Sequence, residues 1–309
     1  MTDHIFSCIE RAPIVIEHGK GAFVWDTTGK KYLDLNAGQF CAVLGHSSMK
    51  VAAMVNAQMK KIVHTSTRAI SPIVQEAAQA IYDICPELQP ESLFLSSGAE
   101  AIEAAIRYAK HITKKSEMIC FENGYHGLSL GAQSVTYGGT WATPMVAGVH
   151  SITAPIFQEL SPGAAKTETA LRLQELKTLL QKRAHAIAGL IMEPIISVGG
   201  MNFLSTEYCQ GIAKLCAEYD VLLLYDECQT GVGRTGKWFA YQQHGVAPDM
   251  LITAKALGAG FPVSLVAFKK TLLARSKISI SHFSSHQNDP LAGAIVVGVI
   301  AEIQEKKLL

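Results

Sequence analysis

The sequence has no excess of charge of either sign and no long apolar run. It carries 27 basic and 26 acidic side chains among 309 residues, for a formal net charge of +1. Nucleic acids and anionic membrane surfaces attract strongly basic proteins, so neither partner is expected from this balance. The longest uncharged apolar stretch near the end, residues 291–301, is too short to cross a bilayer. We therefore expect no nucleic acid and no membrane among the partners.

Cysteine is present, but not in a pattern that builds a cross-linked or metal-binding scaffold. The seven cysteines are scattered along the chain, and no two have the CxxC spacing of metal and redox sites. An odd, scattered set is typical of reduced thiols in a cytoplasm, where disulfides are rare. The opening residues, MTDHIFSCIERAP, lack the apolar core of a secretory signal. The sequence thus predicts a soluble, cytoplasmic protein.

What the sequence does contain is an alternation of apolar strands and amphipathic helices. Residues 14–35 have the pattern of a small β unit, with Thr28-Gly29 as a hairpin turn. The periodicity predicts helices at 49–63, 72–84, from about 99, 168–183, 205–219 and from 290 onward. Apolar runs predict strands at 93–95, 117–122, 149–155, 186–193, 221–227, 248–255 and 262–268.

This order of elements predicts the fold class. Near-continuous apolar strands separated by helices indicate an α/β protein with a mostly parallel sheet covered on both faces. We expect an N-terminal segment with a β hairpin over residues 1–36 and one large domain over residues 37–309.

The segment 221-VLLLYDECQTGVGRTGKW-238 ends a buried strand with Asp226 and continues into a glycine-rich loop. The loop has the Gly-x4-Gly-Lys pattern of a nucleotide-binding phosphate loop. However, Trp238 occupies the position where such a loop needs Ser or Thr to hold magnesium. The loop also follows the acidic strand, whereas a phosphate loop follows the first strand. We reject the nucleotide interpretation and expect a structural turn at 231–236.

A better phosphate site is predicted where residues 96–98, Ser-Ser-Gly, join a strand to a helix. Free amides at a helix N-terminus bind phosphate well. Taken alone, however, Ser97 and Glu100 more simply form a helix-capping box. Ligands of parallel sheets bind at the carboxyl ends of the strands, so Asp226, Glu193 and residues 96–98 are expected to converge on one site.

Lys255 follows another buried strand and precedes Gly258-Ala259-Gly260. Such a lysine is usually solvated, but in a pocket it can lose its charge and attack a carbonyl. A phosphate site, a strand-end aspartate and a pocket lysine together match the needs of pyridoxal 5'-phosphate.

Taken together, these motifs resemble the class III (ornithine-aminotransferase-like) aminotransferases, which are pyridoxal phosphate enzymes of fold type I. The resemblance rests on SSGAEA at 96–101, GYHG at 124–127, EPI at 193–195, DECQTGVGRTG at 226–236 and PDMLITAKALGAGFP at 248–262. It implies that Lys255 forms the Schiff base with the cofactor and that Asp226 pairs with the pyridine nitrogen. The other cofactor-binding residues that it implies are Ser97, Gly98, Ala99, Tyr125, His126, Glu193, Gln229 and Ser285.

The same resemblance implies the reaction and the partners. It predicts transfer of an amino group between an amino acid and a 2-oxo acid, in a homodimer or a dimer of dimers with shared active sites. Members of the family continue into a C-terminal small domain with a carboxylate-binding arginine, but no arginine follows Arg275 and the sequence stops at Leu309. A truncated, non-catalytic homologue that still binds the cofactor is therefore an open alternative.

Within the family, residues 37–46, 193–200 and 285–291 resemble decarboxylation-dependent aminotransferases of the 2,2-dialkylglycine decarboxylase type. This implies that Gln39 helps to hold the carboxylate that is lost. Val198 replaces a serine of that carboxylate pocket and cannot donate a hydrogen bond, which favours ordinary transamination. Both reactions remain open, with transamination slightly preferred.

The decarboxylase resemblance also implies an alkali-metal site for potassium or sodium. Its oxygen donors would come from Thr65, Thr67, Ser285, Gln287 and Asp289, a hard set that suits such an ion. The alternative from the residues alone is that Asp289 is the N-cap of the helix that begins with Pro290. His64 has no partner at metal-ligand spacing and is expected to be an ordinary histidine.

Overall fold

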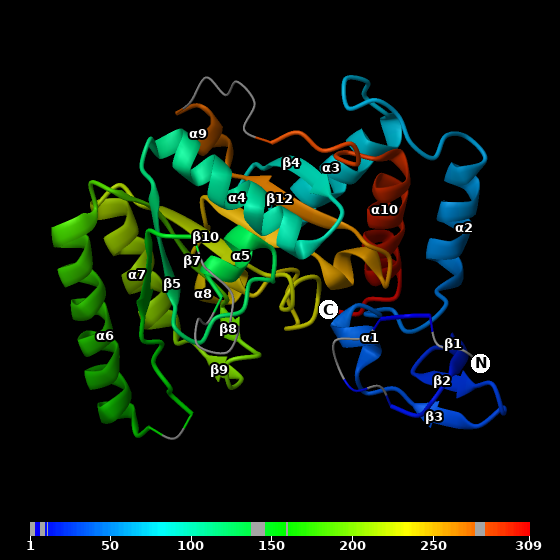
Figure 1. The fold of residues 1–309 in the computed structure, drawn as a ribbon, viewed down its shortest axis with the longest axis horizontal. Helices are drawn as coiled ribbons and strands as arrows, with labels where there is room; N and C mark the ends of the chain where they lie inside the picture. The colour runs from blue at the N-terminus through cyan, green and yellow to red at the C-terminus, as the bar shows by residue number, and fades with distance from the viewer. Residues whose placement is uncertain (1–3, 7–9, 11, 137–145, 159, 276–281) are drawn as a thin grey trace.

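A seven-stranded sheet forms the centre of the protein in the computed structural model, which describes residues 4–6, 10, 12–136, 146–158, 160–275 and 282–309 (Figure 1). The strands are β4 (Glu91–Leu95), β5 (Glu117–Phe121), β6 (Val149–Ile152), β7 (Ile187–Met192), β10 (Leu222–Asp226), β11 (Met250–Thr253) and β12 (Ser264–Phe268). Their order is β4-β12-β11-β10-β7-β5-β6. Strand β12 is antiparallel to both neighbours, whereas the other neighbouring pairs are parallel. The predicted mostly parallel sheet is confirmed.

Helices surround this sheet, and most of them lie where the periodicity predicts (Figure 1). They are α1 (Ala37–Phe40), α2 (Met49–Met59), α3 (Pro72–Ile84), α4 (Gly98–Thr113), α5 (Leu130–Ser134), α6 (Pro162–Arg183), α7 (Thr206–Glu218), α8 (Tyr241–His244), the 3₁₀ helix η1 (Lys255–Gly258), α9 (Lys270–Leu273) and α10 (Pro290–Glu305).

Two predicted helix boundaries are wrong. Helix α2 ends at Met59 rather than residue 63, and the side-chain amide of Gln58 donates to the Ile62 carbonyl in the segment that leaves the helix. Helix α6 begins six residues earlier than the predicted 168, because Ser161 caps it by accepting from the Ala164 amide and Pro162 fixes its first turn.

The strands at the centre are buried on both faces, which explains why their sequences do not alternate. Every residue of β7 and β10 is buried. Leu222 and Leu224 face a core that contains the apolar side of α4, whereas Leu223 and Tyr225 face a second core that contains α3, α6, α7 and α10. Because helices cover both faces, an uninterrupted apolar strand is the stable choice. The α/β layering matches the prediction.

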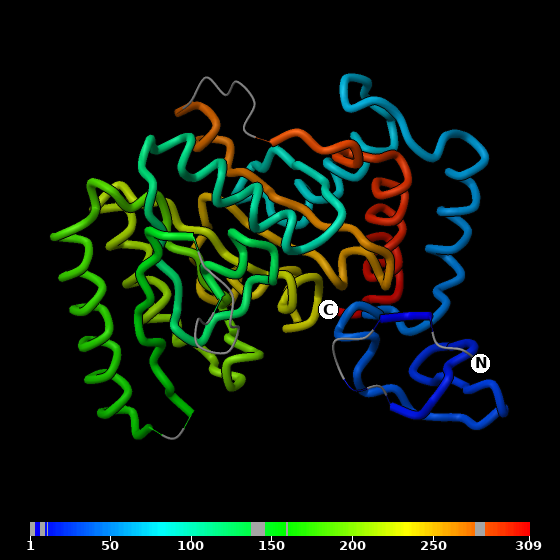
Figure 2. Tube along the Cα trace, in the orientation of Figure 1, coloured from blue at the N-terminus to red at the C-terminus, as the bar shows by residue number. Residues whose placement is uncertain are grey.

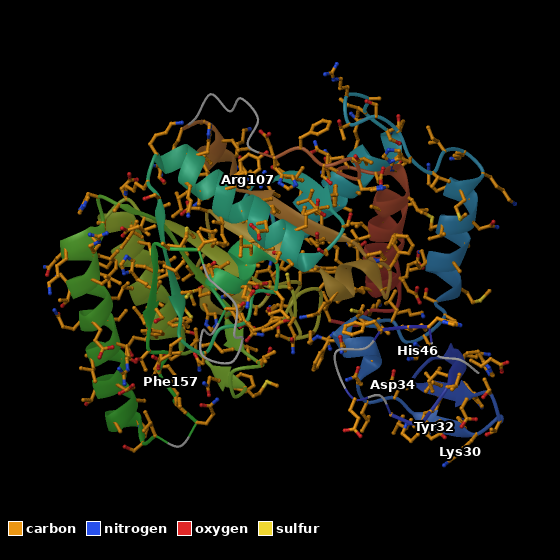
Figure 3. All side chains as sticks on the ribbon, viewed as in Figure 1. Lys30, Tyr32, Asp34, His46, Arg107 and Phe157 are labelled. Atoms are coloured by element: carbon orange, nitrogen blue, oxygen red, sulfur yellow. The ribbon has the colours of Figure 1, made fainter. Side chains whose placement is uncertain are left out.

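The N-terminal segment forms a separate three-stranded antiparallel sheet of β1 (Ile16–Lys20), β2 (Phe23–Asp26) and β3 (Lys31–Leu33). The predicted turn at Thr28-Gly29 joins β2 to β3, and Asp26 stabilises it by accepting from the Thr28 hydroxyl at 2.6 Å and from the Tyr32 hydroxyl at 2.7 Å. Tyr32, Asp34 and His46 lie in this part of the molecule (Figure 3). A third, two-stranded sheet pairs β8 (Ile195–Ile196) with β9 (Asn202–Phe203).

The C-terminal helix α10 contacts the first two long helices of the chain, α2 and α3, as the chain trace shows (Figure 2). The Ser48 hydroxyl at the start of α2 donates to the Glu302 carboxylate of α10. The division at residue 36 stays a prediction. Within the described residues, none of the helices has the length and apolar character that crossing a bilayer requires.

Candidate active site

A cavity of about 480 Å³ opens at the ends of β4, β10 and β11. The residues that line it include the Ser96–Ala99 segment after β4, Asp226 at the end of β10 and Lys255 after β11. Val263, just before β12, also lines it, because the reversed direction of β12 brings its start to this edge. Tyr125 and His126 complete the polar part of the wall. Asp226 and residues 96–98 therefore converge on one cavity, as expected. Glu193 does not line this cavity but contacts the Tyr125 backbone.

Lys255 reaches the cavity from a tight turn. Because β12 is antiparallel to β11, the chain needs no crossover helix and returns through η1 and a short loop. Lys255 opens η1 with φ of 43°, a left-handed conformation that is uncommon for a residue with a side chain. Its Nζ donates to Gln229 Oε1 at 3.3 Å. A conformation of this kind costs on the order of 1–3 kcal/mol and persists where the surrounding structure imposes it.

The carboxylate of Asp226 is held on both of its oxygens. Oδ2 lies 2.7 Å from His126 Nδ1, and Oδ1 accepts from the Cys228 amide at 2.9 Å. Burial alone raises the pKa of this carboxyl, but the hydrogen bond and charge of His126 and the contacts with Cys228 outweigh it, so the pKa of Asp226 lies below its ordinary value. Asp226 is therefore a buried but ionised group at the cavity wall.

The role of His126 as the partner of Asp226 could not be seen in the sequence, because 100 residues separate the two. The other ring nitrogen of His126, Nε2, is buried and has no hydrogen-bond partner in the described part of the chain. A buried nitrogen without a partner is costly and indicates that a further group completes its hydrogen bonding.

The start of helix α4 forms the candidate phosphate site. Ser97 caps the helix by accepting from the Glu100 amide at 3.2 Å, while the Glu100 carboxylate accepts from the Ser96 amide at 3.0 Å. The capping arrangement expected from the sequence is thus present. A side chain on Gly98 would meet the Cys228 sulfur at 3.2 Å, so the helix start packs closely on the strand end.

Gly127 shapes the same wall from the opposite side. Its φ is 120°, and an added Cβ would lie 2.9 Å from the Ala99 Cβ. Only glycine permits this close approach of the 125–127 loop to the start of α4. The loop and the helix start therefore pack closely together and both line the cavity.

Glu193 supports the loop that carries Tyr125. Its Oε1 accepts from the Tyr125 amide at 2.9 Å, and its Oε2 lies 3.5 Å from the Ser197 hydroxyl. Burial raises the pKa of Glu193 to about 7, while the His126 charge lowers it and the Asp226 charge raises it further. Glu193 thus positions the loop rather than lining the cavity.

The residues that follow Asp226 have structural roles. Glu227 is fully buried and accepts from the Ala240 and Tyr241 amides and the Thr230 hydroxyl at 2.7 to 2.8 Å. Burial also raises the pKa of Glu227 to about 7. Burial raises the pKa of the Cys228 thiol well above its ordinary value, which keeps it an unreactive neighbour.

The glycine-rich segment 231–236 is a turn, as the sequence predicts. Arg234 lies in it and joins the turn to two other segments, donating to the Gln229 carbonyl at 2.9 Å and to the Phe40 carbonyl at 2.7 Å. This cation therefore connects α1 to the strand-end loop that carries Gln229.

Gln39 and Ser285 lie outside the cavity wall. Gln39 is exposed in a left-handed conformation (φ 57°), and its amide donates to Asn36 Oδ1 at 2.5 Å. Val198, the residue that departs from the decarboxylase pattern, is also exposed. Ser285 is exposed in the loop before α10. The roles of Gln39 and Ser285 toward carboxylate and phosphate stay predictions.

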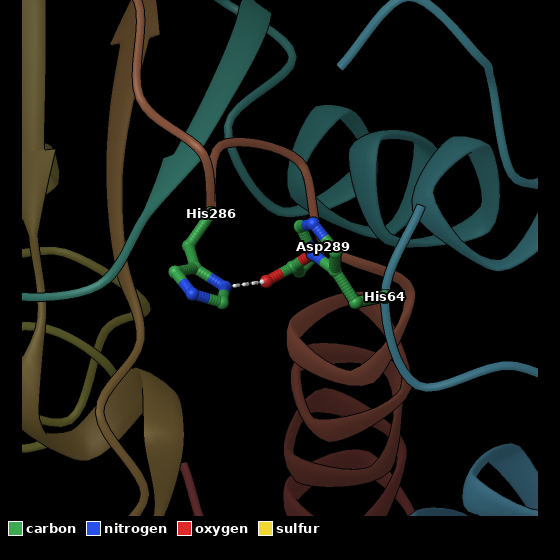
Figure 4. Close-up of side chains that lie close together, drawn as sticks. All are labelled: His64, His286 and Asp289. Carbon is green, nitrogen blue, oxygen red and sulfur yellow. Dashed lines mark hydrogen bonds and ion pairs between the residues drawn. The ribbon is translucent and has the colours of Figure 1, made fainter. Parts of the chain in front are cut away.

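The predicted alkali-metal site at Thr65, Thr67, Ser285, Gln287 and Asp289 stays a prediction. Asp289 occupies the N-cap position of α10, with Pro290 in the first turn, but its side chain makes no capping hydrogen bond. Its two carboxylate oxygens instead contact His64 and His286 (Figure 4). The expectation that His64 is an isolated histidine is wrong, because the fold brings it to a carboxylate 225 residues away. Thr65 and Thr67, which follow His64 in the sequence, are half-buried. The side-chain oxygen of Gln287 accepts from the Ser284 amide at 3.2 Å.

Two of the buried glutamates, Glu193 and Glu227, have raised pKa values and give the protein a specific dependence of stability on pH. Since the pKa of Glu193 is about 7 when folded and about 4.3 when unfolded, the folded protein binds more protons between these values. Glu193 therefore contributes on the order of 3 kcal/mol to the free energy of unfolding. This contribution is fully present below pH of about 4.3 and is lost as pH rises through about 7.

Glu193→Gln is therefore expected to reduce the loss of stability between pH 4.5 and pH 8, while the contribution of Glu227 to that loss remains. Urea unfolding at a series of pH values measures this slope. Glu122→Gln, an exposed glutamate after the neighbouring strand β5, is the control and should leave the slope unchanged. An unaltered slope in Glu193→Gln would contradict the assignment.

A mostly parallel sheet with a lysine, a paired aspartate and a helix start at its carboxyl edge defines a pyridoxal phosphate enzyme of fold type I. The chain belongs to the class III aminotransferase family, whose model matches residues 8–309. It is similar to the acetylornithine aminotransferase of Methanosarcina mazei, with 35% identity over 99% of this chain and 72% of that protein.

Two solved structures share the fold. An (S)-enantioselective omega-transaminase from Thermomicrobium roseum superposes with a TM-score of 0.89 at 28% identity, over 99% of this chain and 73% of that one. An amine transaminase from an uncultivated Pseudomonas species, in its PLP-bound form, gives a TM-score of 0.91 at 25% identity, over 99% and 76% of the two chains. These comparisons establish the family, the cofactor class and the predicted fold.

The residues around the cavity fit pyridoxal phosphate. The cavity offers an amine on Lys255, an ionised carboxylate on Asp226 and the free amides of a helix start, which are the donor and acceptor types that the cofactor's aldehyde, ring nitrogen and phosphate require. The unpartnered Nε2 of His126 and the close approach of Gly127 to Ala99 indicate a wall shaped for a bound group.

Proposed function

We propose that the protein transfers an amino group to a 2-oxo acid by using Lys255 and Asp226 in the cavity described above. The observation that carries this proposal is the presence of Lys255, Asp226 and the Ser97–Ala99 helix start in the wall of one cavity. Bound pyridoxal phosphate supplies a ring that accepts the electron pair developing on the substrate carbon.

The protein's own groups perform the remaining tasks. Lys255 Nζ would hold the cofactor and would move the proton at the substrate carbon as a general base and acid. Asp226, kept ionised by His126, stabilises a positive charge on the ring nitrogen. The start of α4 holds the phosphate, while Gln229 and Tyr125 are proposed to contact the ring oxygen and the ring face.

For the amino donor we propose a substrate whose amino group lies far from its carboxylate. The relative in Methanosarcina mazei is named for acetylornithine and the structural neighbours are named as omega- and amine transaminases, which supports such a donor. Leu128, Phe261 and Pro262 give the cavity apolar walls that suit a chain of methylene groups.

Single-turnover absorbance measurements with a panel of donors test this proposal. N-acetylornithine and simple primary amines are expected to change the cofactor spectrum faster than alanine or glutamate does. 2-Aminoisobutyrate, which has no α-proton, is expected to give neither turnover nor carbon dioxide.

The other outcomes each support a different function. Release of carbon dioxide from 2-aminoisobutyrate would support the decarboxylase alternative and a role for Gln39. Faster reaction with alanine or glutamate would overturn the proposed donor class while leaving the aminotransferase. Cofactor binding with no response to any donor would support a non-catalytic homologue.

We also propose that the protein is a homodimer with shared active sites. Exposed large apolar side chains support a partner surface, among them Leu35, Met49, Ile70 and Phe283. Ser285, outside this cavity wall, is proposed to reach the partner's phosphate. Six cysteines of the described residues are free, and Cys8 lies outside those residues. The cytoplasmic location that was predicted from the cysteine pattern stays a prediction.

A further inference from the structure

Three side chains from two distant segments meet beside the start of helix α10 (Figure 4). Nδ1 of His64 lies 2.5 Å from Asp289 Oδ1, and Nδ1 of His286 lies 2.6 Å from Asp289 Oδ2. One ligand atom from each residue lies within 4.8 Å of the other two. His64 follows α2, whereas His286 and Asp289 belong to the loop before α10.

We propose that His64, His286 and Asp289 bind one divalent transition-metal ion of the zinc class. Two imidazole nitrogens and one carboxylate oxygen are the ligand types that Zn²⁺, Co²⁺ and Ni²⁺ prefer, and they leave open positions for water. Ligands about 2.0–2.2 Å from a tetrahedral ion stand roughly 3.3–3.5 Å apart. The three groups need to separate by about 1 Å to admit the ion, which small rotations of surface side chains provide.

The two histidines are partly exposed in the single chain, whereas Asp289 is largely covered. The side chains of His64 and His286 are 44% and 64% exposed, while Asp289 is 14% exposed and anchored at the helix start. The carboxylate at the helix start provides an anionic ligand, and each of the two imidazoles contacts a different oxygen of it. This combination differs from a buried structural histidine, which is enclosed by packing.

The orientation of Asp289 also favours a ligand role. An N-cap aspartate ordinarily accepts from the amides of the first helical turn. Asp289 occupies this position but makes no such bond, and both oxygens point to histidines instead. A metal-free hydrogen-bonded group of two histidines and a carboxylate is the competing interpretation, and it requires the proton of each ring to be on Nδ1.

A metal at this position would stabilise the cavity indirectly. Asn288, next to Asp289, pairs with the outer strand: its amide donates to the Phe94 carbonyl at 2.9 Å, and its side-chain oxygen accepts from the Phe94 amide at 3.0 Å. Strand β4 then leads directly into Ser96 and Ser97 at the cavity. The ion would therefore fix the loop that supports the phosphate end of the site.

The proposed ligands separate this site from the alkali-metal site considered above. An alkali ion is bound by oxygen atoms and gains little from imidazole, whereas a zinc-class ion depends on both histidines. Asp289 is common to the two sites, so replacing a histidine distinguishes them and replacing Asp289 does not. This inference does not depend on the proposed donor or reaction.

The test uses tag-free, cofactor-loaded protein that has been treated with a chelator and then titrated with Zn²⁺ against a chromophoric competitor. We expect one tight site per chain, and a visible Co²⁺ spectrum of a nitrogen- and oxygen-bound ion. His64→Gln and His286→Gln should each weaken Zn²⁺ binding by at least about tenfold, since even residues that only orient a ligand contribute about that much. Zn²⁺ should also raise the melting temperature of the wild-type protein but not of these variants.

His185→Gln is the matched control, because His185 is an exposed histidine in the turn after α6. It should bind Zn²⁺ as the wild type does. Equal Zn²⁺ affinity in the wild type, His286→Gln and His64→Gln would overturn the proposal and leave the hydrogen-bonded group. Stabilisation by K⁺ or Na⁺ that survives both histidine replacements, without a Zn²⁺ site, would also overturn it in favour of the alkali-metal site.

Discussion

Replacing Lys255 with alanine is expected to reduce amino-group transfer by about 10⁴-fold or more, because the same nitrogen both holds the cofactor and moves the proton. The hydrogen bond that the variant loses is the one from Nζ to Gln229 Oε1, so the turn that carries residue 255 is expected to fold normally. Borohydride reduction followed by peptide mapping should place the pyridoxyl group on Lys255 in the wild type and on no lysine in the variant.

Lys237→Ala is the matched control for this experiment. Lys237 is exposed in the glycine-rich turn and is the lysine that a nucleotide-binding loop would have used. Its replacement should leave both the adduct and the rate unchanged. A pyridoxyl adduct on Lys237, or full activity in Lys255→Ala, would refute the assignment.

Replacing Asp226 with asparagine is expected to lower kcat by roughly 10²–10³-fold, or about 3–4 kcal/mol, while the cofactor stays bound. The reason is electrostatic: asparagine keeps the shape but removes the negative charge that His126 and the Cys228 amide now hold in place. Single-turnover rates with a saturating donor, together with the cofactor's absorbance, separate loss of chemistry from loss of binding.

Asp249→Asn provides the control for a general effect of removing a carboxylate from the sheet. Asp249 accepts from the Leu223 amide at 2.9 Å and lies before β11, away from the residues that line the cavity. This variant is expected to lose stability, while its single-turnover rate stays within a fewfold of the wild type. If Asp226→Asn and Asp249→Asn had the same rate, the charge of Asp226 would have no specific role.

The parts of the site that depend on local patterns could be predicted from the sequence. The end of a buried strand can be recognised in the sequence by the change from apolar to polar residues. This change predicts that Asp226 and Lys255 lie at the same edge of the sheet, where both line the cavity. The capping pair at Ser97 and Glu100 is likewise readable from residues three positions apart. The layered α/β fold follows from strands that are apolar on both faces.

The parts that depend on contacts between distant segments could not be predicted. His126 meets Asp226 across 100 residues, and His64 meets Asp289 across 225. No periodicity links such positions, because only the final packing of helices and strands brings them together. The reversed direction of β12 belongs to the same class, since an apolar strand has the same composition whichever way it runs.

The pairing of Asn288 with Phe94 affects whether a strand of another chain can pair with β4. Strand β4 lies at the border of the seven-stranded sheet, and a border strand with open amides and carbonyls is a template on which another chain can add. Asn288 pairs with this open edge as a neighbouring strand would. Its backbone amide donates to the Phe94 carbonyl, and its side-chain oxygen accepts from the Phe94 amide. The loop before α10 thus occupies backbone groups of β4 that could otherwise pair with another chain, which opposes edge-to-edge aggregation.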